Sequence, residues 1–344
     1  MNEAHALRAA LKHIAAGDDL DEEVMSDAMG EIMDGVASDA LMAGFLVGLR
    51  VKGETPEEIA GAVLAMRQRA VAIHPRDSRI MDTCGTGGDG AGTFNISTAV
   101  AFVCASAGVT VAKHGNRAIS SRVGSADVLE ALGVNLSLSP LAVTRCIDEL
   151  GVGFMFAPNH HGALRHAGPV RRELGFRTLL NLLGPMTNPA SATHQLVGIF
   201  DPSRVQTVAR VLGHLGSKRA LVVHGCDGLD EITLAGPTQA ALWDGEHVED
   251  LTLHPNDVGL EVTSADALAG GEAPHNAAII RRVLAGSNGP CADIVRLNAG
   301  ASLWVAEAAD TLADGVAMAT ELMQAGAPLK RLERLVALSQ ALAS

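Results

Sequence analysis

The sequence predicts an α/β protein in which a small all-helical domain precedes a large α/β domain with a central, mostly parallel sheet flanked by helices. Three observations indicate this fold. The first seventy residues have the apolar spacing and capping residues of helices. From Arg79 onward, short β-branched runs alternate with helical segments. Near the start of that region, Asp82 to Gly90 forms a glycine-rich run between an apolar strand and a helix. We therefore expect a helical domain over residues 1–73, joined by part of 160–190, and an α/β domain over 78–344.

The N-terminal helices are predicted from their caps. Ser38 is expected to cap a helix over 39–52 that ends at Gly53, and Thr55-Pro56-Glu57-Glu58 is a capping box that starts the next helix. The helix over 39–52 is apolar around most of its circumference, so it is expected to be buried on more than one side. Either another subunit or the rest of the same chain can cover the second side.

The larger domain follows after His74-Pro75, which is typical of a linker. Its strands are expected at 80–81, 110–112, 135–138, 154–157, 196–200, 219–224, 240–243 and 248–253. Its helices are expected at 95–107, 126–132 with Ser125 as the cap, 140–150, 160–173 and 202–215, with mostly helical structure after 276.

Composition limits the classes of function. The net charge of −13 disfavours nucleic acid as a partner, because an acidic surface repels phosphates. The longest apolar stretch, 99–112, is too short to span a membrane, and the N-terminus lacks the pattern of a signal peptide. Five cysteines without a Cys-x-x-Cys pair indicate reduced thiols, so we expect a cytoplasmic location.

The run from Asp82 to Gly90 is the strongest local signal for a ligand. Glycines let the backbone approach a ligand closely, and a helix that begins just beyond them offers free N–H groups to an anion such as phosphate. The spacing fits neither the dinucleotide nor the P-loop fingerprint. The competing interpretation is a glycine turn that only reverses the chain.

Two further loops carry polar groups, and loops after parallel strands meet at one edge of a sheet. Lys113, Arg117 and several serines offer cationic and hydroxyl donors, and Asp230-Glu231 offers adjacent carboxylates. Taken alone, the acidic pair is better explained as a solvated turn, and His114 is better explained as a packed or hydrogen-bonding side chain than as a metal ligand. Together, the loops predict a site for a multiply phosphorylated ligand with Mg²⁺.

Several motifs in order give the chain a specific resemblance. They are Gly85-Thr86-Gly87-Gly88-Asp89, Asn95-Ile96-Ser97-Thr98, Lys113-His114-Gly115-Asn116-Arg117, Ser120-Ser121 with Gly124-Ser125-Ala126-Asp127, Val170 to Thr178, Asn181-Leu182-Leu183-Gly184-Pro185 and Asp227-Gly228-Leu229-Asp230-Glu231. With these motifs, the chain resembles the anthranilate phosphoribosyltransferase family, whose members share the nucleoside-phosphorylase fold. The resemblance runs nearly from end to end.

The resemblance implies substrates, a metal and their residues. For 5-phosphoribosyl 1-diphosphate (PRPP) it implies Gly85, Gly88, Asp89, Thr93, Asn95, Ile96, Ser97, Thr98, Lys113, His114, Gly115, Asn116, Arg117, Ala118, Ile119, Ser120, Ser121 and Ser125. For anthranilate it implies Gly85, Asn116 and Arg171, and for Mg²⁺ it implies Ser97, Asp230 and Glu231.

The implied reaction moves the phosphoribosyl group of PRPP to the amine of anthranilate, which gives N-(5-phosphoribosyl)anthranilate and diphosphate in tryptophan biosynthesis. No acid–base catalytic residue is expected, since catalysis would be electrostatic and positional, with Lys113 and Mg²⁺ assisting. The family also implies a homodimer formed through the N-terminal helices. Two alternatives remain open: a pyrimidine nucleoside phosphorylase of the same fold, and a non-enzymatic relative that binds nucleic acid.

Overall fold

The computed structural model describes residues 4–118 and 122–342. Over these residues the chain divides into two compact units, and each is described by itself. The helical unit comprises Met1–Ala72 with Ala157–Pro189, and the α/β unit comprises Ile73–Phe156 with Ala190–Ser344. No helix among the described residues combines the length and apolar character needed to cross a bilayer.

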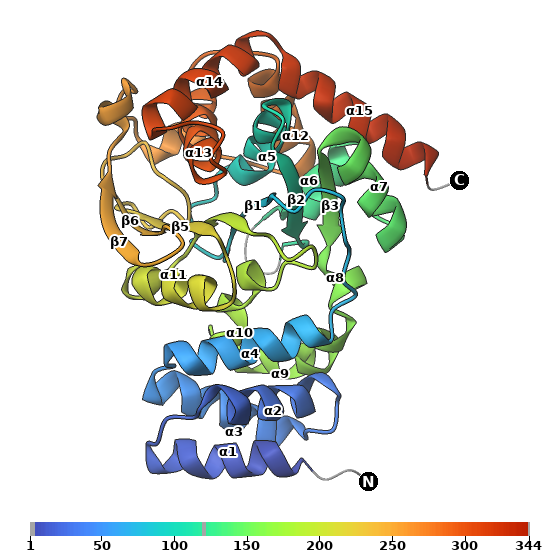
Figure 1. The fold of residues 1–344 in the computed structure, drawn as a ribbon, viewed down its shortest axis with the longest axis vertical. Helices are drawn as coiled ribbons and strands as arrows, with labels where there is room; N and C mark the ends of the chain where they lie inside the picture. Colours follow the sequence, from blue (N-terminus) through green and yellow to red (C-terminus); the bar gives the residue numbers. More distant parts are fainter. Residues whose placement is uncertain (1–3, 119–121, 343–344) are drawn as a thin grey trace. The chain divides into compact units, whose positions relative to one another are not determined.

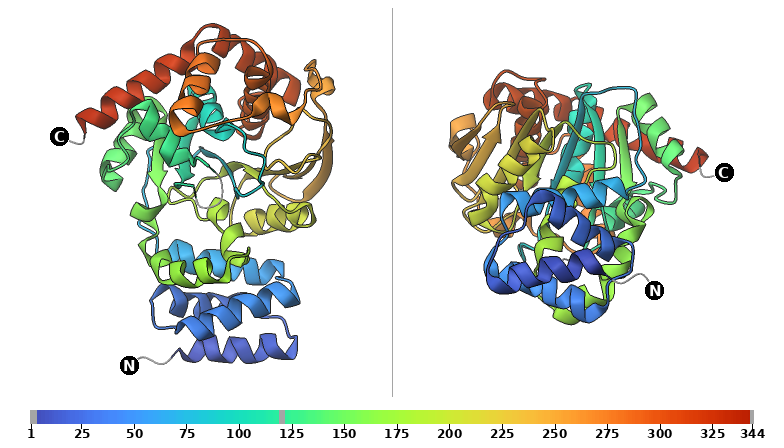
Figure 2. Two further views of the ribbon diagram at one scale, coloured as in Figure 1. Left: turned by 180° about the vertical axis from the view of Figure 1, so that it is seen from behind. Right: turned by 60° about the horizontal axis from the view of Figure 1, so that its bottom comes forward.

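The helical unit is made of short, well-capped helices. Asp21 accepts a hydrogen bond from Val24 N (2.8 Å), and Thr55 and Glu58 form the predicted capping box. Figure 1 shows its first four helices in blue, and Figure 2 shows them from behind. Its helices are α1 (His5–Ala16), α2 (Glu22–Met33), α3 (Asp39–Lys52), α4 (Pro56–Gln68), α8 (Ala157–His160), α9 (Gly168–Leu174) and α10 (Leu179–Leu182), with 3₁₀ turns η1 (Gly162–Ala167) and η2 (Gly184–Met186).

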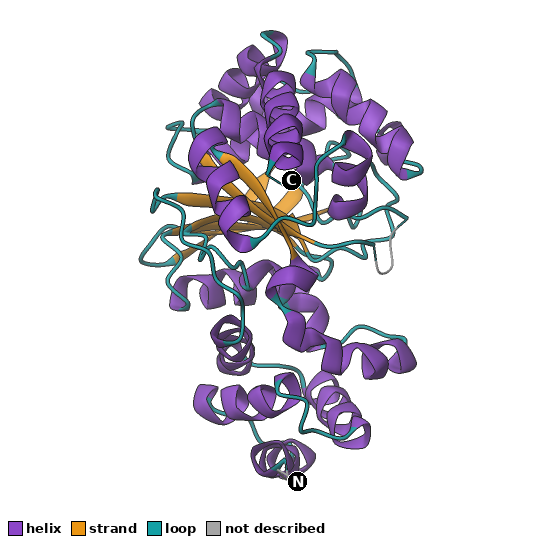
Figure 3. Ribbon diagram, turned by 90° about the vertical axis from the view of Figure 1, so that its right-hand side faces the viewer, coloured by secondary structure: helices purple, strands orange, loops and turns teal. Residues whose placement is uncertain are grey.

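The α/β unit contains, within its described residues, one seven-stranded sheet of order β3-β2-β1-β4-β5-β6-β7. All pairs from β3 to β5 are parallel, and β6 and β7 are antiparallel. The orange strands of Figure 3 form this sheet. Its strands are β1 (Ile80–Gly85), β2 (Thr110–Gly115), β3 (Val152–Phe156), β4 (His194–Gly198), β5 (Arg219–Gly225), β6 (Thr238–Trp243) and β7 (Val248–Leu253).

Helices cover both faces of the sheet. α5 and α13 pack on one face, and α11 packs against β5 and β6 on the other (Figure 1). α5 is almost entirely buried, which agrees with its Ala- and Val-rich sequence. The helices of this unit are α5 (Ile96–Ser106), α6 (Ser125–Leu132), α7 (Pro140–Leu150), α11 (Val205–His214), α12 (Ala273–Leu284), α13 (Pro290–Val305), α14 (Leu312–Gln324) and α15 (Ala327–Ala341), with 3₁₀ turns η3 (Pro202–Arg204), η4 (Pro255–Val258) and η5 (Ala265–Leu268).

The strand order places a switch point between β1 and β4. From β1 the chain crosses by α5 to β2 on one side, and from β4 it crosses by α11 to β5 on the other side. Ligands of open α/β sheets bind beyond the carboxyl ends of the strands at such a point. The loops that follow β1, β2 and β5 all leave from this edge. The predicted fold class, a helical domain with a mostly parallel α/β sheet, is confirmed.

Several details differ from the sequence prediction. The helix expected over 160–173 is divided into the 3₁₀ turn η1 and the helix α9, and residue 157 begins α8 instead of ending a strand. Residues 135–138 are not a strand, because Asn135 N donates to Ser339 Oγ (3.1 Å) and Ser137 N donates to Asn135 Oδ1 (2.8 Å). Gly124, not Ser125, is the N-cap of α6. Lys113 lies within β2 instead of following it, so its direction is fixed by the sheet.

Candidate active site

The glycine loop that follows β1 is held to the end of β4. Thr86 N donates to the carbonyl of Gly198 (2.9 Å), and the Thr86 hydroxyl accepts from Phe200 N (3.2 Å). Gly87 and Gly88 have φ of 68° and 74°, which residues with a side chain rarely adopt. The loop therefore turns sharply while its first residue stays fixed to the sheet.

The acidic turn between β5 and β6 meets this loop. The carboxylate of Asp230 accepts a hydrogen bond from Gly87 N (2.7 Å), and Glu231 accepts one from Ser97 N (3.2 Å). A Cβ on Gly85 would lie 2.4 Å from Asp230 Oδ2, and one on Gly198 would lie 1.5 Å from the Asp230 carbonyl oxygen. Both glycines are thus needed to admit Asp230. The structure brings the first glycine turn and the two acids together, as the sequence predicted.

Lys113 adds the positive charge beside these acids. Its side chain is 3% exposed, and its Nζ donates to Ser97 Oγ (3.1 Å) and to the carbonyl of Thr83. Ser97 and Thr98 lie in the first turn of α5, where free N–H groups and the helix dipole favour an anion. The buried Thr98 hydroxyl has no hydrogen-bond partner among the described residues. These groups form a polar, partly enclosed cradle.

The electrostatics of the acidic turn favour a bound cation. Burial and the charge of Asp89 raise the pKa of Glu231 to about 7, against the opposing effects of Lys113 and Ser97 N–H. Burial, Asp89 and Glu231 together hold the pKa of Asp230 well above its usual range. These carboxylates repel one another where they are partly shielded from solvent, so a divalent cation would favour their charged form. The oxygen donors of this set suit Mg²⁺.

The loop after β2 is partly described. Arg117 is paired with Asp127 (2.9 Å) and Glu130 (2.9 Å), and its guanidinium lies over the ring of Phe156. Ala118 N also donates to Asp127 (3.0 Å). These contacts attach the loop to α6, so Arg117 stabilises the conformation of the loop. Ser125, the first residue of α6, lies close to Gly115, whose missing side chain leaves it room. Ile119, Ser120 and Ser121 lie outside the described residues.

Asn95, the residue before α5, is hydrogen-bonded to two other segments. Asn95 Nδ2 donates to the carbonyl of Val123 (3.0 Å), and Asn95 Oδ1 accepts from Asn276 Nδ2 (3.1 Å). Asn276 in turn accepts from Gly271 N (2.7 Å), beside the bridge between Thr93 and Ala269. Asn276 was missed by sequence reasoning, because a single asparagine in a helix carries no local signal.

The remaining predicted residues are placed as follows. Ile96 is buried at the start of α5, and Asp89 accepts from Ala91 N (3.2 Å) within the glycine loop. His114 is buried in β2, and its backbone N–H donates to Asp82 Oδ1 (3.2 Å). Burial and the charge of Asp82 raise the pKa of the Cys84 thiol, so a thiolate nucleophile is not favoured there.

Arg171 belongs to α9 of the helical unit. It is partly buried, and this burial lowers the pKa of its guanidinium. Its side chain makes no hydrogen bond or ion pair with any described residue of the chain. A guanidinium in this state is suited to a carboxylate ligand, which would offset the cost of burial.

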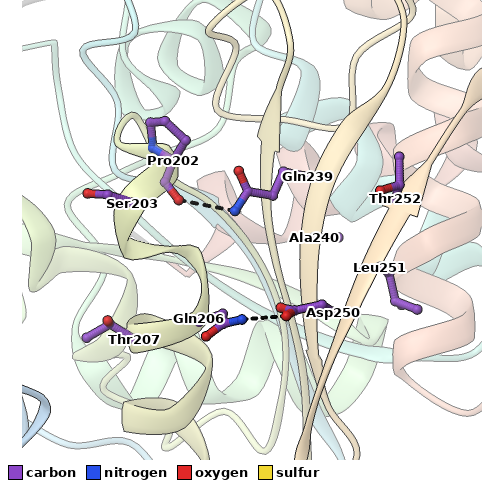
Figure 4. Close-up of a pocket in the computed structure, with 9 residues that line it drawn as sticks. All are labelled: Pro202, Ser203, Gln206, Thr207, Gln239, Ala240, Asp250, Leu251 and Thr252. Atoms are coloured by element: carbon purple, nitrogen blue, oxygen red, sulfur yellow. Dashed lines mark hydrogen bonds between the residues drawn. The ribbon is translucent and has the colours of Figure 1, made fainter.

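A separate polar groove of about 370 Å³ lies between α11 and the β6–β7 strands (Figure 4). Gln206 is hydrogen-bonded to Asp250 across it, and Gln239 Nε2 donates to the carbonyl of Pro202 (3.3 Å). None of the predicted site residues lines this groove.

Comparisons with known proteins agree with the fold. The α/β-domain model of the glycosyl transferase family matches residues 77–329, and the helical bundle domain model of that family matches residues 8–70. The anthranilate phosphoribosyltransferase of Moorella thermoacetica is 52% identical over 331 residues, covering 96% of this chain and 98% of that protein. That of Thioalkalivibrio sulfidiphilus is 51% identical over 337 residues, covering 98% of each.

Solved structures give the same result. The crystal structure of anthranilate phosphoribosyltransferase from Thermus thermophilus has a TM-score of 0.92 and 46% identity, covering 96% of this chain and 99% of that chain. The enzyme from Saccharomyces cerevisiae in complex with PRPP and Mg has a TM-score of 0.89 and 26% identity, covering 97% and 98%. Full-length identity near one half, together with the matched domain models, leads to one conclusion: this chain belongs to the anthranilate phosphoribosyltransferase family of glycosyl transferases.

Proposed function

We propose that this chain transfers the phosphoribosyl group of PRPP to the amine of anthranilate and releases diphosphate, the tryptophan-pathway step. The observation that carries this proposal is the contact between the glycine loop and the acidic turn at the switch point, through Gly87 N and Asp230. It combines backbone donors for phosphate with carboxylates for a divalent cation. It is supported by relatives named anthranilate phosphoribosyltransferase, which share about half of their residues with this chain.

PRPP is proposed to lie against the glycine loop and the first turn of α5. Backbone N–H groups at Gly88 and Asp89 would meet the diphosphate, and the hydroxyls of Ser97 and Thr98 would donate to its oxygens. Lys113 is already aligned by Thr83 and Ser97 and would place its charge on the departing anion. The unpartnered Thr98 hydroxyl supports this assignment, since a ligand oxygen would satisfy it.

Ser97, Asp230 and Glu231 are proposed to hold Mg²⁺. Within residues 4–118 and 122–342, no three His, Cys, Asp or Glu side chains form a cluster that would hold a metal ion. Other ligands would then come from PRPP and water, which is usual for Mg²⁺. When bound, Mg²⁺ would neutralise charge that develops on the diphosphate. A neighbouring structure described as a PRPP and Mg complex supports the choice of metal.

Anthranilate is proposed to contact Gly85, Asn116 and Arg171, with the Arg171 fork on its carboxylate. An aromatic amine is neutral near pH 7, so it attacks without a strong base. The chain's task is then to position the amine and exclude water.

The test follows anthranilate fluorescence. We expect it to fall when PRPP and Mg²⁺ are added, and to stay constant when a chelator is present. Fluorescence that stays constant with both additions would overturn the proposed reaction. A parallel assay of phosphate-dependent thymidine cleavage distinguishes a nucleoside phosphorylase, and we expect no cleavage.

The helical unit also supports the predicted homodimer, which we propose forms through α1 and α3. A groove of about 760 Å³ lies between them, lined by small and apolar residues that include Gly44, Val47 and Gly48. Val51 beside it is 81% exposed. A second copy of the same helices would bury this surface.

Sedimentation velocity tests this dimer. Val51→Glu should yield monomers at concentrations where the native chain is dimeric. Leu141→Glu, at an 80% exposed site on α7, is the matched control and should leave the dimer intact. A native chain that sediments as a monomer would overturn the proposal.

A cytoplasmic location is retained as a proposal. It is supported by five cysteines that are all free thiols in the structure.

A further inference from the structure

The acidic turn is braced from behind by a residue far away in the sequence. Asn298 lies on α13, and its side chain is fully buried. Its Oδ1 accepts from Ile232 N (2.9 Å), and its Nδ2 donates to the carbonyl of the same residue (2.9 Å). One amide thus satisfies both backbone groups of the residue that directly follows Glu231. Such a paired contact fixes the plane of the backbone in two directions.

Other hydrogen bonds either shape the turn locally or join its carboxylates to the glycine loop and α5. Gly225 N donates to the carbonyl of Leu229 (2.9 Å), and the Thr233 hydroxyl donates to Asp227 (2.8 Å). These two bonds lie within the turn, whereas Gly87 N and Ser97 N reach its two carboxylates from the side of the proposed site. The Asn298 amide connects the backbone of the turn to α13, since its Nδ2 also donates to the carbonyl of Ile294 within that helix (2.9 Å).

α13 is a suitable reference for the position of the turn. It is buried along nearly its whole length, and it packs on β4 and on α5. α5 carries Ser97 in its first turn. One helix therefore supports both elements that carry the proposed Mg²⁺ ligands: α5 through packing, and the acidic turn through the Asn298 amide.

We propose that Asn298 is a positioning residue for the divalent-cation site. Its amide holds Ile232 so that the carboxylates of Asp230 and Glu231 face Ser97 and the glycine loop. This inference rests on the proposed function, because it concerns the same site. Residues that orient metal ligands typically change metal affinity about 10- to 100-fold when mutated.

The experiment compares two buried polar residues on the same helix. Asn298→Leu removes both bonds to Ile232. Ser302→Ala removes a buried hydroxyl that donates to the carbonyl of Asn298 (2.8 Å) within the same helix, and it leaves both bonds to Ile232 in place. PRPP binding is measured by titration calorimetry over a series of Mg²⁺ concentrations, without anthranilate. We expect Asn298→Leu to raise the half-saturating Mg²⁺ concentration about 10- to 100-fold, and Ser302→Ala to leave it within about twofold.

Turnover supplies a second readout. At saturating Mg²⁺, kcat of Asn298→Leu should return to within about threefold of the native value, because the ligands themselves remain. If Asn298→Leu does not fold, Asn298→Ala replaces it, with an expected rise of about 3- to 10-fold in the half-saturating Mg²⁺ concentration.

The outcomes separate the two proposals. If the native chain binds PRPP without dependence on Mg²⁺, the proposed metal site itself fails. If the native chain depends on Mg²⁺ but the Asn298 variants require no more of it than Ser302→Ala does, the positioning role is overturned. The positioning role is also overturned if both variants lose thermal stability and neither changes its half-saturating Mg²⁺ concentration.

Discussion

Two glutamates, fully buried Glu58 in the helical unit and partly buried Glu231 in the α/β unit, have opposite surroundings. Glu58 of the helical unit is fully buried, and its carboxylate accepts from Leu20 N (2.9 Å), Thr55 N (2.9 Å) and Lys52 Nζ (3.0 Å). Glu231 of the α/β unit accepts one backbone hydrogen bond, from Ser97 N, and it faces the charge of Asp89. The first carboxylate is satisfied by its own chain, whereas the second is not.

This difference separates a structural charge from one that is proposed to bind a metal ion. A buried carboxylate that is fully paired stabilises the link between α3, α4 and the segment before α2. One that lacks partners costs stability, and it persists where a ligand can supply the missing charge. The α/β unit therefore has carboxylates with few hydrogen-bond partners at the carboxyl edge of its sheet, whereas the Glu58 carboxylate of the helical unit is well paired.

The largest expected effect comes from removing the structural charge. Glu58→Ala should destabilise the helical unit by about 3 to 5 kcal/mol, because it leaves two N–H groups without their acceptor and removes one of the two carboxylates paired with Lys52, which keeps Asp19. Hydrogen exchange of the amides in α3 and α4 measures this loss locally. Glu57→Ala is the control, since Glu57 is exposed in the same first turn. Equal protection in the two variants would show that Glu58 is not a structural charge.

Removing the charge of Glu231, which is proposed to bind the metal, should have the opposite result: activity should fall while stability is kept. Glu231→Gln is expected to lower kcat/KM about 100- to 1000-fold through loss of a proposed metal ligand. Its stability at pH 8 without Mg²⁺ should equal or exceed that of the native chain, because a repelled buried charge is gone. Steady-state kinetics and thermal unfolding give the two numbers, with exposed Glu249→Gln as the control. A Glu231→Gln variant that is less stable and still fully active would show that Glu231, like Glu58, is a structural charge.

The sequence predicted the parts of this contrast that have local signals. The capping box at Thr55 and Glu58, the helix over 140–150 and the strand over 248–253 all depend on neighbouring residues, and the structure has them at those positions. The glycine loop and the acidic pair were also found, because each is a compact motif. These features need no knowledge of tertiary contacts.

The rest depends on contacts between distant residues. Asn298 braces the acidic turn from 66 positions away, and Asn276 reaches Asn95 from 181 positions away. Residues 135–138 alternate like a strand, yet Ser339 takes the backbone donor of Asn135. A single asparagine or serine in a helix looks the same whether it is solvated or buried against a loop, so sequence patterns cannot identify these braces.

The pH dependence sharpens the comparison further. Burial lowers the pKa of His161 in the helical unit from 6.5 to about 4, so the folded state binds fewer protons than the unfolded chain. Its contribution is complete above pH 6.5 and is lost as pH falls toward 4, a change of about 3 kcal/mol. Glu231 has the opposite sign, because its pKa is raised from 4.5 to about 7. Its contribution is complete below pH 4.5 and is lost as pH rises through 7.

Unfolding measured between pH 4 and 8 in Mg²⁺-free buffer resolves these two slopes. His161→Asn should remove the loss on the acidic side, and Glu231→Gln should remove the loss on the neutral side. Adding Mg²⁺ with PRPP should restore stability near pH 7 to the native chain and not to Glu231→Gln. Identical profiles for all three proteins would mean that neither group is buried as the structure indicates.

The smallest expected effect concerns the one cation of the helical unit that is proposed to bind substrate. Arg171→Ala should raise the KM for anthranilate about 10- to 100-fold, because a charge-assisted pair with the carboxylate is lost. If that contact is equally strong in the ground and transition states, kcat changes little. Arg172→Ala, exposed on the same helix, is the matched control and should behave as the native chain does. An unchanged KM for Arg171→Ala would show that Arg171 does not bind the substrate and that its charge, like that of Glu58, is structural.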